Sequence, residues 1–97
     1  MREPLEELDP VLSVPVRLAV ISVLIKVKQA DFKTLMEAAQ TTQGNMSYQL
    51  TKLQNEQYIT IEKTSNGNYP LTLCKITPKG RKAFERYVEA IRKYLHL

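Results

Sequence analysis

The chain has 97 residues, 43% hydrophobic and 25% charged, and a formal net charge of +4 at pH 7. This length allows one domain with a small core, and the composition is that of a globular rather than a disordered protein. No apolar run approaches the roughly 20 residues that span a bilayer, whereas the positive charge permits binding to nucleic acid.

Two prolines shape the first predicted helix. Asp9-Pro10 predicts a capped turn over residues 10–13, and Pro15 begins the helix proper, which should run to about Lys28. One apolar side of this helix is formed by Val16, Ala19, Val20, Val23 and Val27. The other is formed by Leu18, Ile21 and Ile25. Because a helix with two apolar faces needs two covering layers, we expect the second face to meet a partner subunit, the C-terminal helix or both.

A second and a third helix follow with very little chain between them. Asp31 can cap a helix over residues 32–39, which would turn Phe32, Leu35, Met36 and Ala39 inward. Only Gln40–Thr42 separates this helix from the next, and two short helices joined by such a turn make a helix-turn-helix. A short extended segment at residues 29–31 could pair with a later hairpin.

The third predicted helix, over residues 43–56 with Thr42 as its cap, has an apolar stripe and a polar, nearly uncharged face. Met46, Leu50 and Leu53 fall at i, i+4 and i+7 and form the stripe. The opposite face carries Gln43, Asn45, Ser47, Tyr48, Thr51, Lys52 and Asn55. A face of amides and hydroxyls can hydrogen-bond to base edges but carries little charge, so it is better suited to reading bases than to non-specific electrostatic binding. Taken alone, the same pattern fits an ordinary amphipathic helix with a solvated face equally well.

A β-hairpin and a final helix complete the chain. Tyr58–Thr64 alternates apolar and polar residues, as a half-buried strand does, and Ser65-Asn66-Gly67-Asn68 is a strong turn signal. Tyr69–Thr77 would be the return strand, with Cys74 and Ile76 inward and Pro70 suited to an edge. Thr77-Pro78 predicts the start of a helix that reaches about Leu95. Its apolar arc contains Phe84, Tyr87, Val88, Ile91, Tyr94 and Leu95.

Four segments of the chain resemble the winged-helix transcriptional regulators of the MarR/ArsR type. They are LDPVLSVPVRLAVISVL at 8–24, ADFKTLMEA at 30–38, TQGNMSYQLTKLQNEQYITIEKT at 42–64 and ITPKGRKAFERYVEAI at 76–91. The most specific parts are T-x-G-N-[ML]-S-x-x-L-x-K-L at 42–53 and T-P-K-G at 77–80. The resemblance implies an α+β winged helix-turn-helix, with a three-helix core, a β-hairpin wing and a C-terminal amphipathic helix. Residues 1–97 would be one domain, and residues 78–97 its dimerisation helix.

The resemblance also implies where this chain meets its partners, namely double-stranded DNA and a second copy of itself. In such proteins the third helix enters the major groove, the wing touches the backbone or minor groove, and the first and last helices build a twofold dimer. The implied DNA contacts are Thr42, Gln43, Gly44, Asn45, Ser47, Tyr48, Thr51, Lys52, Lys63, Ser65, Asn66 and Asn68. The implied dimer contacts are Leu18, Ile21, Ile25, Phe84, Tyr87, Val88, Ile91, Tyr94 and Leu95.

Within that set the side chains suggest different roles. The amides of Gln43 and Asn45 can make bidentate contacts to adenine, whereas Lys52 is better placed for phosphates. Gly44 would let the backbone come close to a phosphate at the helix N-terminus. The chain departs from the family pattern at Gln49, which is often His. The wing tip has no Arg, so deep insertion into the minor groove is not expected.

Charge and chemistry limit the alternatives. From Lys79 to Leu97 there are six basic and two acidic residues (+4), so the other 78 residues sum to zero and the basic patch lies away from the third helix. A winged helix used as a protein-interaction module, or a purely structural dimerisation unit, therefore stays open. Arg17 is expected to form a structural ion pair rather than a phosphate contact.

No enzyme, metal or cofactor is expected. The sequence lacks a nucleophile–base motif and a glycine-rich phosphate loop, and a lone Cys74 with His96 is too few ligands for a metal site. One cysteine excludes an intramolecular disulfide, and the acidic start, MREPLEELDP, has no hydrophobic signal region. We therefore expect a cytoplasmic protein with no membrane partner. A small-molecule effector, in a crevice beside Tyr87 and Tyr94, is possible but has no support in the sequence.

Overall fold

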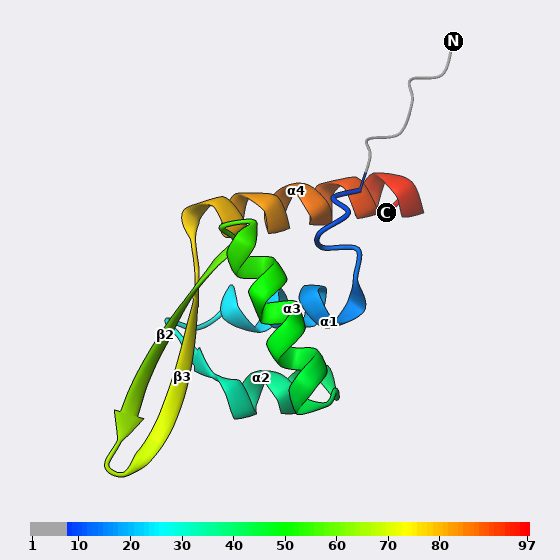
Figure 1. The fold of residues 1–97 in the computed structure, drawn as a ribbon. Helices are drawn as coiled ribbons and strands as arrows, with labels where there is room; N and C mark the ends of the chain where they lie inside the picture. The colour runs from blue at the N-terminus through cyan, green and yellow to red at the C-terminus, as the bar shows by residue number, and fades with distance from the viewer. Residues whose placement is uncertain (1–7) are drawn as a thin grey trace.

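The structure is a computed structural model that describes residues 8–97, so the acidic stretch up to residue 7 lies outside the described residues. The elements are α1 (Pro15–Leu24), β1 (Ala30–Asp31), α2 (Phe32–Ala39), α3 (Gln43–Asn55), β2 (Ile59–Asn66), β3 (Tyr69–Ile76) and α4 (Pro78–Leu95). Figure 1 shows α1, α2 and α3 grouped on one side of α4, while the β2–β3 hairpin projects from the body. This arrangement confirms the predicted α+β winged helix-turn-helix.

Three of the helices begin with the caps that the sequence predicts. The side chains of Asp31, Thr42 and Thr77 each accept a hydrogen bond from the backbone N–H three residues later, at 2.8, 3.2 and 2.9 Å. These bonds satisfy N–H groups that the first turn of a helix leaves unpaired. At the end of α2, Gln40 takes a left-handed conformation with φ 50°. The chain therefore passes directly from α2 into α3, as the short predicted turn requires.

The strands form one antiparallel sheet in the order β1-β3-β2. Ala30 pairs with Cys74, so the short extended segment does join the hairpin. The strand predicted to end at Thr64 continues to Asn66, which leaves a two-residue turn in which Gly67 has φ +66°. Pro70 lies on the central strand, β3, rather than on an edge strand. Because β1 pairs only with residues 73 and 74, the part of β3 around Pro70 nevertheless has a single neighbouring strand.

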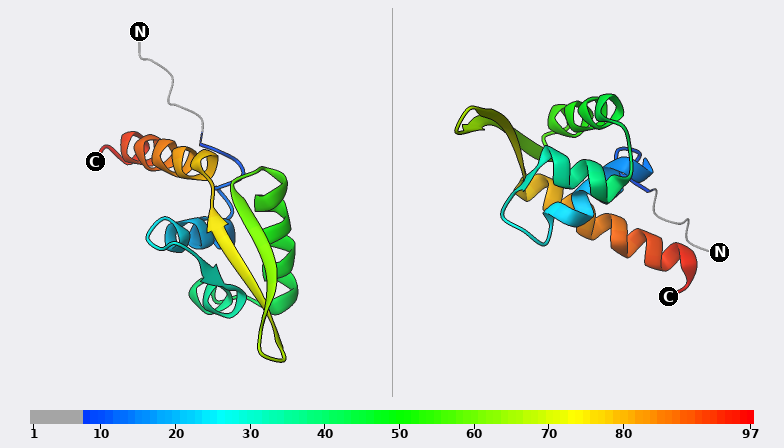
Figure 2. Two further views of the ribbon diagram at one scale, coloured as in Figure 1. Left: turned by 90° about the vertical axis from the view of Figure 1, so that its left-hand side faces the viewer. Right: turned by 90° about the horizontal axis from the view of Figure 1, so that it is seen from below.

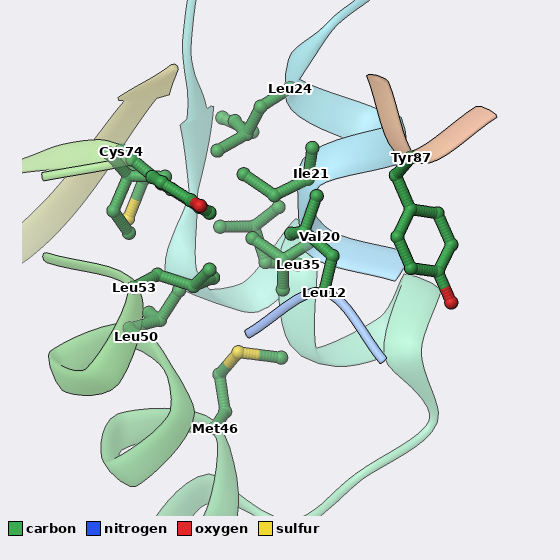
Figure 3. Packing of buried hydrophobic residues seen from close by; sticks show 13 residues of the cluster. Leu12, Val20, Ile21, Leu24, Leu35, Met46, Leu50, Leu53, Cys74 and Tyr87 are labelled. Carbon is green, nitrogen blue, oxygen red and sulfur yellow. The ribbon is translucent and has the colours of Figure 1, made fainter. Parts of the chain in front are cut away.

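The core lies where α1, α2, α3 and the base of the sheet meet. Figure 3 shows side chains from these elements converging, with Tyr87 of α4 at the margin of the cluster. The fully buried residues are Leu12, Val20, Ile21, Leu24, Leu35, Met46, Leu53 and Cys74. The inward orientation predicted for Leu35 and Cys74 is therefore confirmed.

The structure corrects two expectations about the first helix. The helix ends at Leu24 rather than near Lys28, and Val27, expected on a buried side, is 44% exposed. Val20 and Ile21, which a helical wheel places on opposite faces, are both 0% exposed. Adjacent residues lie only about 100° apart on a helix, so a wide buried sector covers both. Ile21 is thus a core residue, and its assignment to a dimer interface is wrong.

Helix α4 crosses one side of the helical core and its C-terminal end reaches past the other helices, as the two views of Figure 2 also show. It buries Tyr87 and Ala90, whereas Tyr94 and Leu95 near its end are each 54% exposed. No helix in the range 8–97 combines the length and the apolar character needed to cross a membrane.

Candidate DNA interface

Helix α3 is anchored on one side and open on the other. Its apolar stripe is buried as predicted, with Met46 and Leu53 at 0% and Leu50 at 2% exposure. The opposite side carries the exposed residues Gln43, Gly44, Ser47, Tyr48, Thr51 and Lys52. The burial of the stripe therefore fixes which face of α3 is presented to a partner, and that face is made of amides, hydroxyls and one ammonium group.

A groove of about 520 Å³ lies between α3 and the wing. Gln43, Ser47 and Thr51 of α3 line it on one side, and Lys63 of β2 lines it on the other. Lys33, at the start of α2, also lines the groove and was not singled out from the sequence. Hydroxyls, an amide and two lysines are groups that proteins use to contact the phosphate backbone. The rest of the lining is mainly apolar and includes Leu50, Ile61 and Leu71, so the groove is a mixed surface that connects α3 to the wing.

The wing adds exposed polar residues and one aromatic ring. Lys63, Ser65, Asn66 and Asn68 are all exposed, as a contact surface requires. Tyr69, which pairs with Asn66 across the turn, is 77% exposed and is a residue that the sequence reasoning missed. Its place directly after the Asn66–Asn68 turn was the available signal, because residues beside a hairpin turn lie at the tip of the arm.

Tyr48 and Lys52 act as a pair on the exposed face of α3. The Lys52 Nζ lies 5.2 Å from the centre of the Tyr48 ring, at the i, i+4 spacing that brings helix side chains together. Tyr48 is 55% exposed, so its ring remains accessible beside the ammonium group. Such a cation–π contact contributes about 0.5–1 kcal/mol at an exposed site and orients both groups.

Asn45 differs from its neighbours because it is half-buried and already hydrogen-bonded at both ends of its amide. Its Nδ2 donates to the Thr41 hydroxyl at 2.8 Å, and its Oδ1 accepts from Gln49 Nε2 at 3.2 Å. Gln49, only 9% exposed, accepts in turn from Arg17 Nε at 2.7 Å.

Arg17 itself does not behave as expected. Its Nη1 also donates to the Val11 carbonyl at 3.4 Å, so in the described part of the chain it bonds to neutral acceptors. Within residues 8–97 the predicted ion pair of Arg17 is therefore not formed, because the fold brings the side-chain amide of Gln49 and the carbonyl of Val11 to its guanidinium.

The residues predicted to form a dimer surface are only partly brought together. Leu18 of α1 and four residues of α4 line a mostly apolar groove of about 650 Å³ between the two helices: Phe84, Tyr87, Val88 and Ile91. Tyr94 and Leu95 continue this face along α4 and are exposed. Ile25 follows α1, is half-buried and does not line the groove.

Cys74 is a core residue, as predicted. It is 0% exposed, and burial raises the pKa of its thiol from the ordinary 9.0 to about 11. Among residues 8–97, no three His, Cys, Asp or Glu side chains gather as metal ligands would.

Comparisons with known proteins agree with this geometry. The model of the winged helix DNA-binding domain family matches residues 16–95. The uncharacterized protein MJ0432 of Methanocaldococcus jannaschii is 32% identical over 76 residues, which are 78% of this chain and 83% of that protein.

Two solved structures share the fold. The transcriptional regulator homologue from Pyrococcus horikoshii superposes with a TM-score of 0.80 at 22% identity, over 89% of this chain and 85% of that one. A MarR family transcriptional regulator from Silicibacter pomeroyi gives a TM-score of 0.69 at 19% identity, over 86% of this chain and 54% of that one. The chain belongs to the winged helix DNA-binding domain family, and its fold is that of the MarR-type transcriptional regulators.

Proposed function

We propose that this protein is a homodimeric transcription regulator that binds double-stranded DNA through α3 and the wing. The observation that carries the proposal is the one-sided burial of α3, which leaves a face of amides and hydroxyls open to a partner. Family membership, and the lysines, hydroxyls and amide that help to line the groove between α3 and the wing, support the same conclusion.

In this proposal α3 lies in the major groove and the wing follows the backbone. Gln43 and Asn45 contact base edges, with adenine as the base that a side-chain amide reads best. Thr42, Gly44, Ser47 and Thr51 approach the phosphates, aided by the N-terminal end of the helix, where unpaired N–H groups favour anions. Lys52 and the wing residues Lys63, Asn66 and Asn68 add contacts that position the protein without reading sequence.

The dimer is proposed to form through the groove between α1 and α4. A second copy would cover Leu18, Phe84, Val88 and Ile91 and the exposed end of α4 at Tyr94 and Leu95, while Tyr87 is only 9% exposed within its own protomer. Two copies related by a twofold axis present two α3 helices to successive major grooves, about 34 Å apart. The preferred DNA sequence is therefore a pseudo-palindrome.

Selection of bound duplexes from a random pool, followed by a salt titration, tests the DNA assignment. We expect one enriched pseudo-palindrome and a shallow log–log salt slope of about −3 to −6 per dimer, because few lysines lie near α3. Lys52→Ala should weaken binding to all sequences alike, whereas Asn45→Ala should cost about 1–3 kcal/mol at the selected site only. If neither variant differs from wild type, α3 does not contact DNA and a protein-interaction module becomes the better assignment.

Sedimentation equilibrium tests the dimer separately. Wild type should be dimeric at tens of micromolar, and Val88→Glu, which places a charge at the groove, should be monomeric. Lys82→Glu makes a matched control, because Lys82 is exposed on α4 and does not line the groove. A monomeric wild type would refute the dimer while leaving DNA binding to be judged by the selection experiment.

A further inference from the structure

A chain of hydrogen bonds lies beneath the exposed face of α3 and fixes which end of each side-chain amide in it donates and which accepts. It runs from the guanidinium of Arg17 on α1 through Gln49 and Asn45 to the hydroxyl of Thr41. Arg17 Nε and Gln49 Oε1 are 2.7 Å apart, although the two residues are separated by 32 positions in sequence. Arg17, which lies outside the helix-turn-helix, is therefore linked by hydrogen bonds through Gln49 to Asn45 on the proposed reading face.

The direction of every bond in this chain follows from Arg17. A guanidinium has only donors, so Gln49 must turn its oxygen toward Arg17 and its NH₂ toward Asn45. Asn45 must then present its oxygen to Gln49, and its own NH₂ is left for the Thr41 hydroxyl. The amides of Asn and Gln otherwise turn over at little cost, since oxygen and nitrogen have the same shape. Here the orientation of Asn45 is set by a charged group two bonds away.

The same two bonds leave part of the hydrogen-bonding capacity of Asn45 unused. Thr41 lies four residues before Asn45 and Gln49 four residues after it, so the nitrogen of the amide faces the start of α3 and the oxygen its end. The two internal bonds use one of the two amide hydrogens and one of the two oxygen lone pairs. One hydrogen and one lone pair remain, which is the pair that a bidentate contact to adenine N7 and N6 requires.

We propose that Arg17 and Gln49 are positioning residues that fix the donor–acceptor polarity of Asn45, and that this polarity makes α3 select adenine at one position of each half-site. The proposal rests on the proposed function, since it concerns how α3 reads DNA. Gln49 and Arg17 do not touch the base. They act by preventing Asn45 from turning over, so the discrimination of bases depends on them while general DNA affinity does not.

Gln49→Glu is the variant that separates this role from a structural one. Glutamate is similar in shape and still accepts from Arg17, so the link between α1 and α3 is kept. Its carboxylate cannot donate to Asn45, so Asn45 must turn its NH₂ toward that carboxylate and its oxygen toward the Thr41 hydroxyl, which reverses its polarity. Arg17→Lys is the conservative control, because lysine is also only a donor and should hold Gln49 in its wild-type orientation.

The measurement is the ratio of affinities for the selected duplex and for duplexes in which the Asn45-dependent base is replaced. We expect wild type and Arg17→Lys to discriminate about 5- to 150-fold, and Gln49→Glu to lose most of this ratio. The added charge should also weaken Gln49→Glu on all duplexes equally, which leaves the ratio unaffected. Thermal unfolding of each variant verifies that it is folded at the assay temperature.

A second measurement on the free protein does not depend on any variant binding DNA. The side-chain NH₂ protons of Asn45 should exchange with water more slowly than those of Asn55, an exposed asparagine on the same helix. Arg17→Met should remove this protection, whereas Arg17→Lys should retain it.

Two results would overturn the inference while leaving DNA binding intact. The first is a selected site in which no adenine is preferred because of Asn45. The second is a Gln49→Glu variant that distinguishes the selected duplex from the base-substituted duplexes as well as wild type does. Equal exchange at Asn45 and Asn55 would overturn it as well. A wild-type protein that enriches no duplex at all would instead refute the proposed function, and the inference with it.

Discussion

Gly80 is the residue whose replacement by alanine should most clearly reveal how α4 is attached. A Cβ atom at this position would lie 2.2 Å from the backbone oxygen of Tyr58 and 3.1 Å from Cγ1 of Ile76. An ordinary contact begins at 3.4 Å, so the overlap with the carbonyl oxygen is about 1.2 Å. Because the clash is with backbone rather than with the end of a flexible side chain, the start of α4 must move.

That movement would disturb the hydrogen bonds that tie α4 to the end of α3. The Thr77 N–H donates to the Tyr58 carbonyl at 3.0 Å, and the Thr77 hydroxyl donates to the Gln57 carbonyl at 2.6 Å and caps Gly80. Overpacking costs about 1–3 kcal/mol and a weakened cap about 1 kcal/mol. The better helix propensity of alanine returns about 1 kcal/mol. We therefore expect Gly80→Ala to lower the free energy of unfolding by about 1–3 kcal/mol.

Thermal unfolding followed by circular dichroism measures this effect. A loss of about 2 kcal/mol corresponds to a fall in Tm of about 8–16 °C for a domain of this size. Gly44→Ala is the matched control, since Gly44 is also in the first turn of a helix but a Cβ there would meet nothing within 4 Å. Gly44→Ala should raise stability by about 0.5 kcal/mol. Equal changes in Tm for the two variants would refute the reasoning.

Three further predictions concern pH, a buried hydroxyl and the wing. The folded chain holds the Cys74 proton more tightly than the unfolded chain, so stability should be full below pH 9 and fall by about 2–3 kcal/mol as the pH rises to 11. Urea unfolding of Cys74→Ala should show a smaller loss over this range, and the part that remains above pH 10 comes from Tyr58, whose pKa is also raised by burial and by its hydrogen bond to Asp9. Tyr58→Phe removes a hydrogen bond of 2.5 Å to the Asp9 carboxylate and should lower the free energy of unfolding by about 1.5–3 kcal/mol. Urea unfolding at pH 7 measures this loss, and an unchanged midpoint would contradict the contact. Tyr69→Ala should weaken duplex binding without changing Tm, because its ring is 77% exposed; a wing that stays clear of DNA would show no change.

The helices and strands could be predicted from the sequence because their signals are local. Asp31, Thr42 and Thr77 each precede a helix and accept an N–H three residues on, which is a relation within one turn. The alternation from Ile59 onward and the Asn66-Gly67 pair likewise specify a hairpin with little help from the rest of the chain. The burial of Met46, Leu50 and Leu53 follows from their spacing alone.

The errors occurred where packing between elements decides the outcome. A helical wheel places Val20 and Ile21 on different faces, but it does not give the width of the sector that α2, α3 and α4 cover. Both residues are buried because α1 is enclosed on several sides. Gly80 could be recognised from the sequence as part of a family motif. The reason why a glycine is needed there, the close approach of the Tyr58 carbonyl, depends on packing and is visible only in the structure.

The polar face of α3 shows most clearly how far a functional site can be predicted from the sequence. Its members could be identified from the sequence, because they lie opposite an apolar stripe, and the four-residue spacing of Thr41, Asn45 and Gln49 gives Asn45 local partners. The direction of their hydrogen bonds is set by Arg17, which reaches Gln49 across 32 positions and through it restrains the amide of Asn45. A pattern within α3 can therefore name the residues that face a partner. Which of those residues is held rigid enough to distinguish one base from another depends on α1, and hence on the fold as a whole.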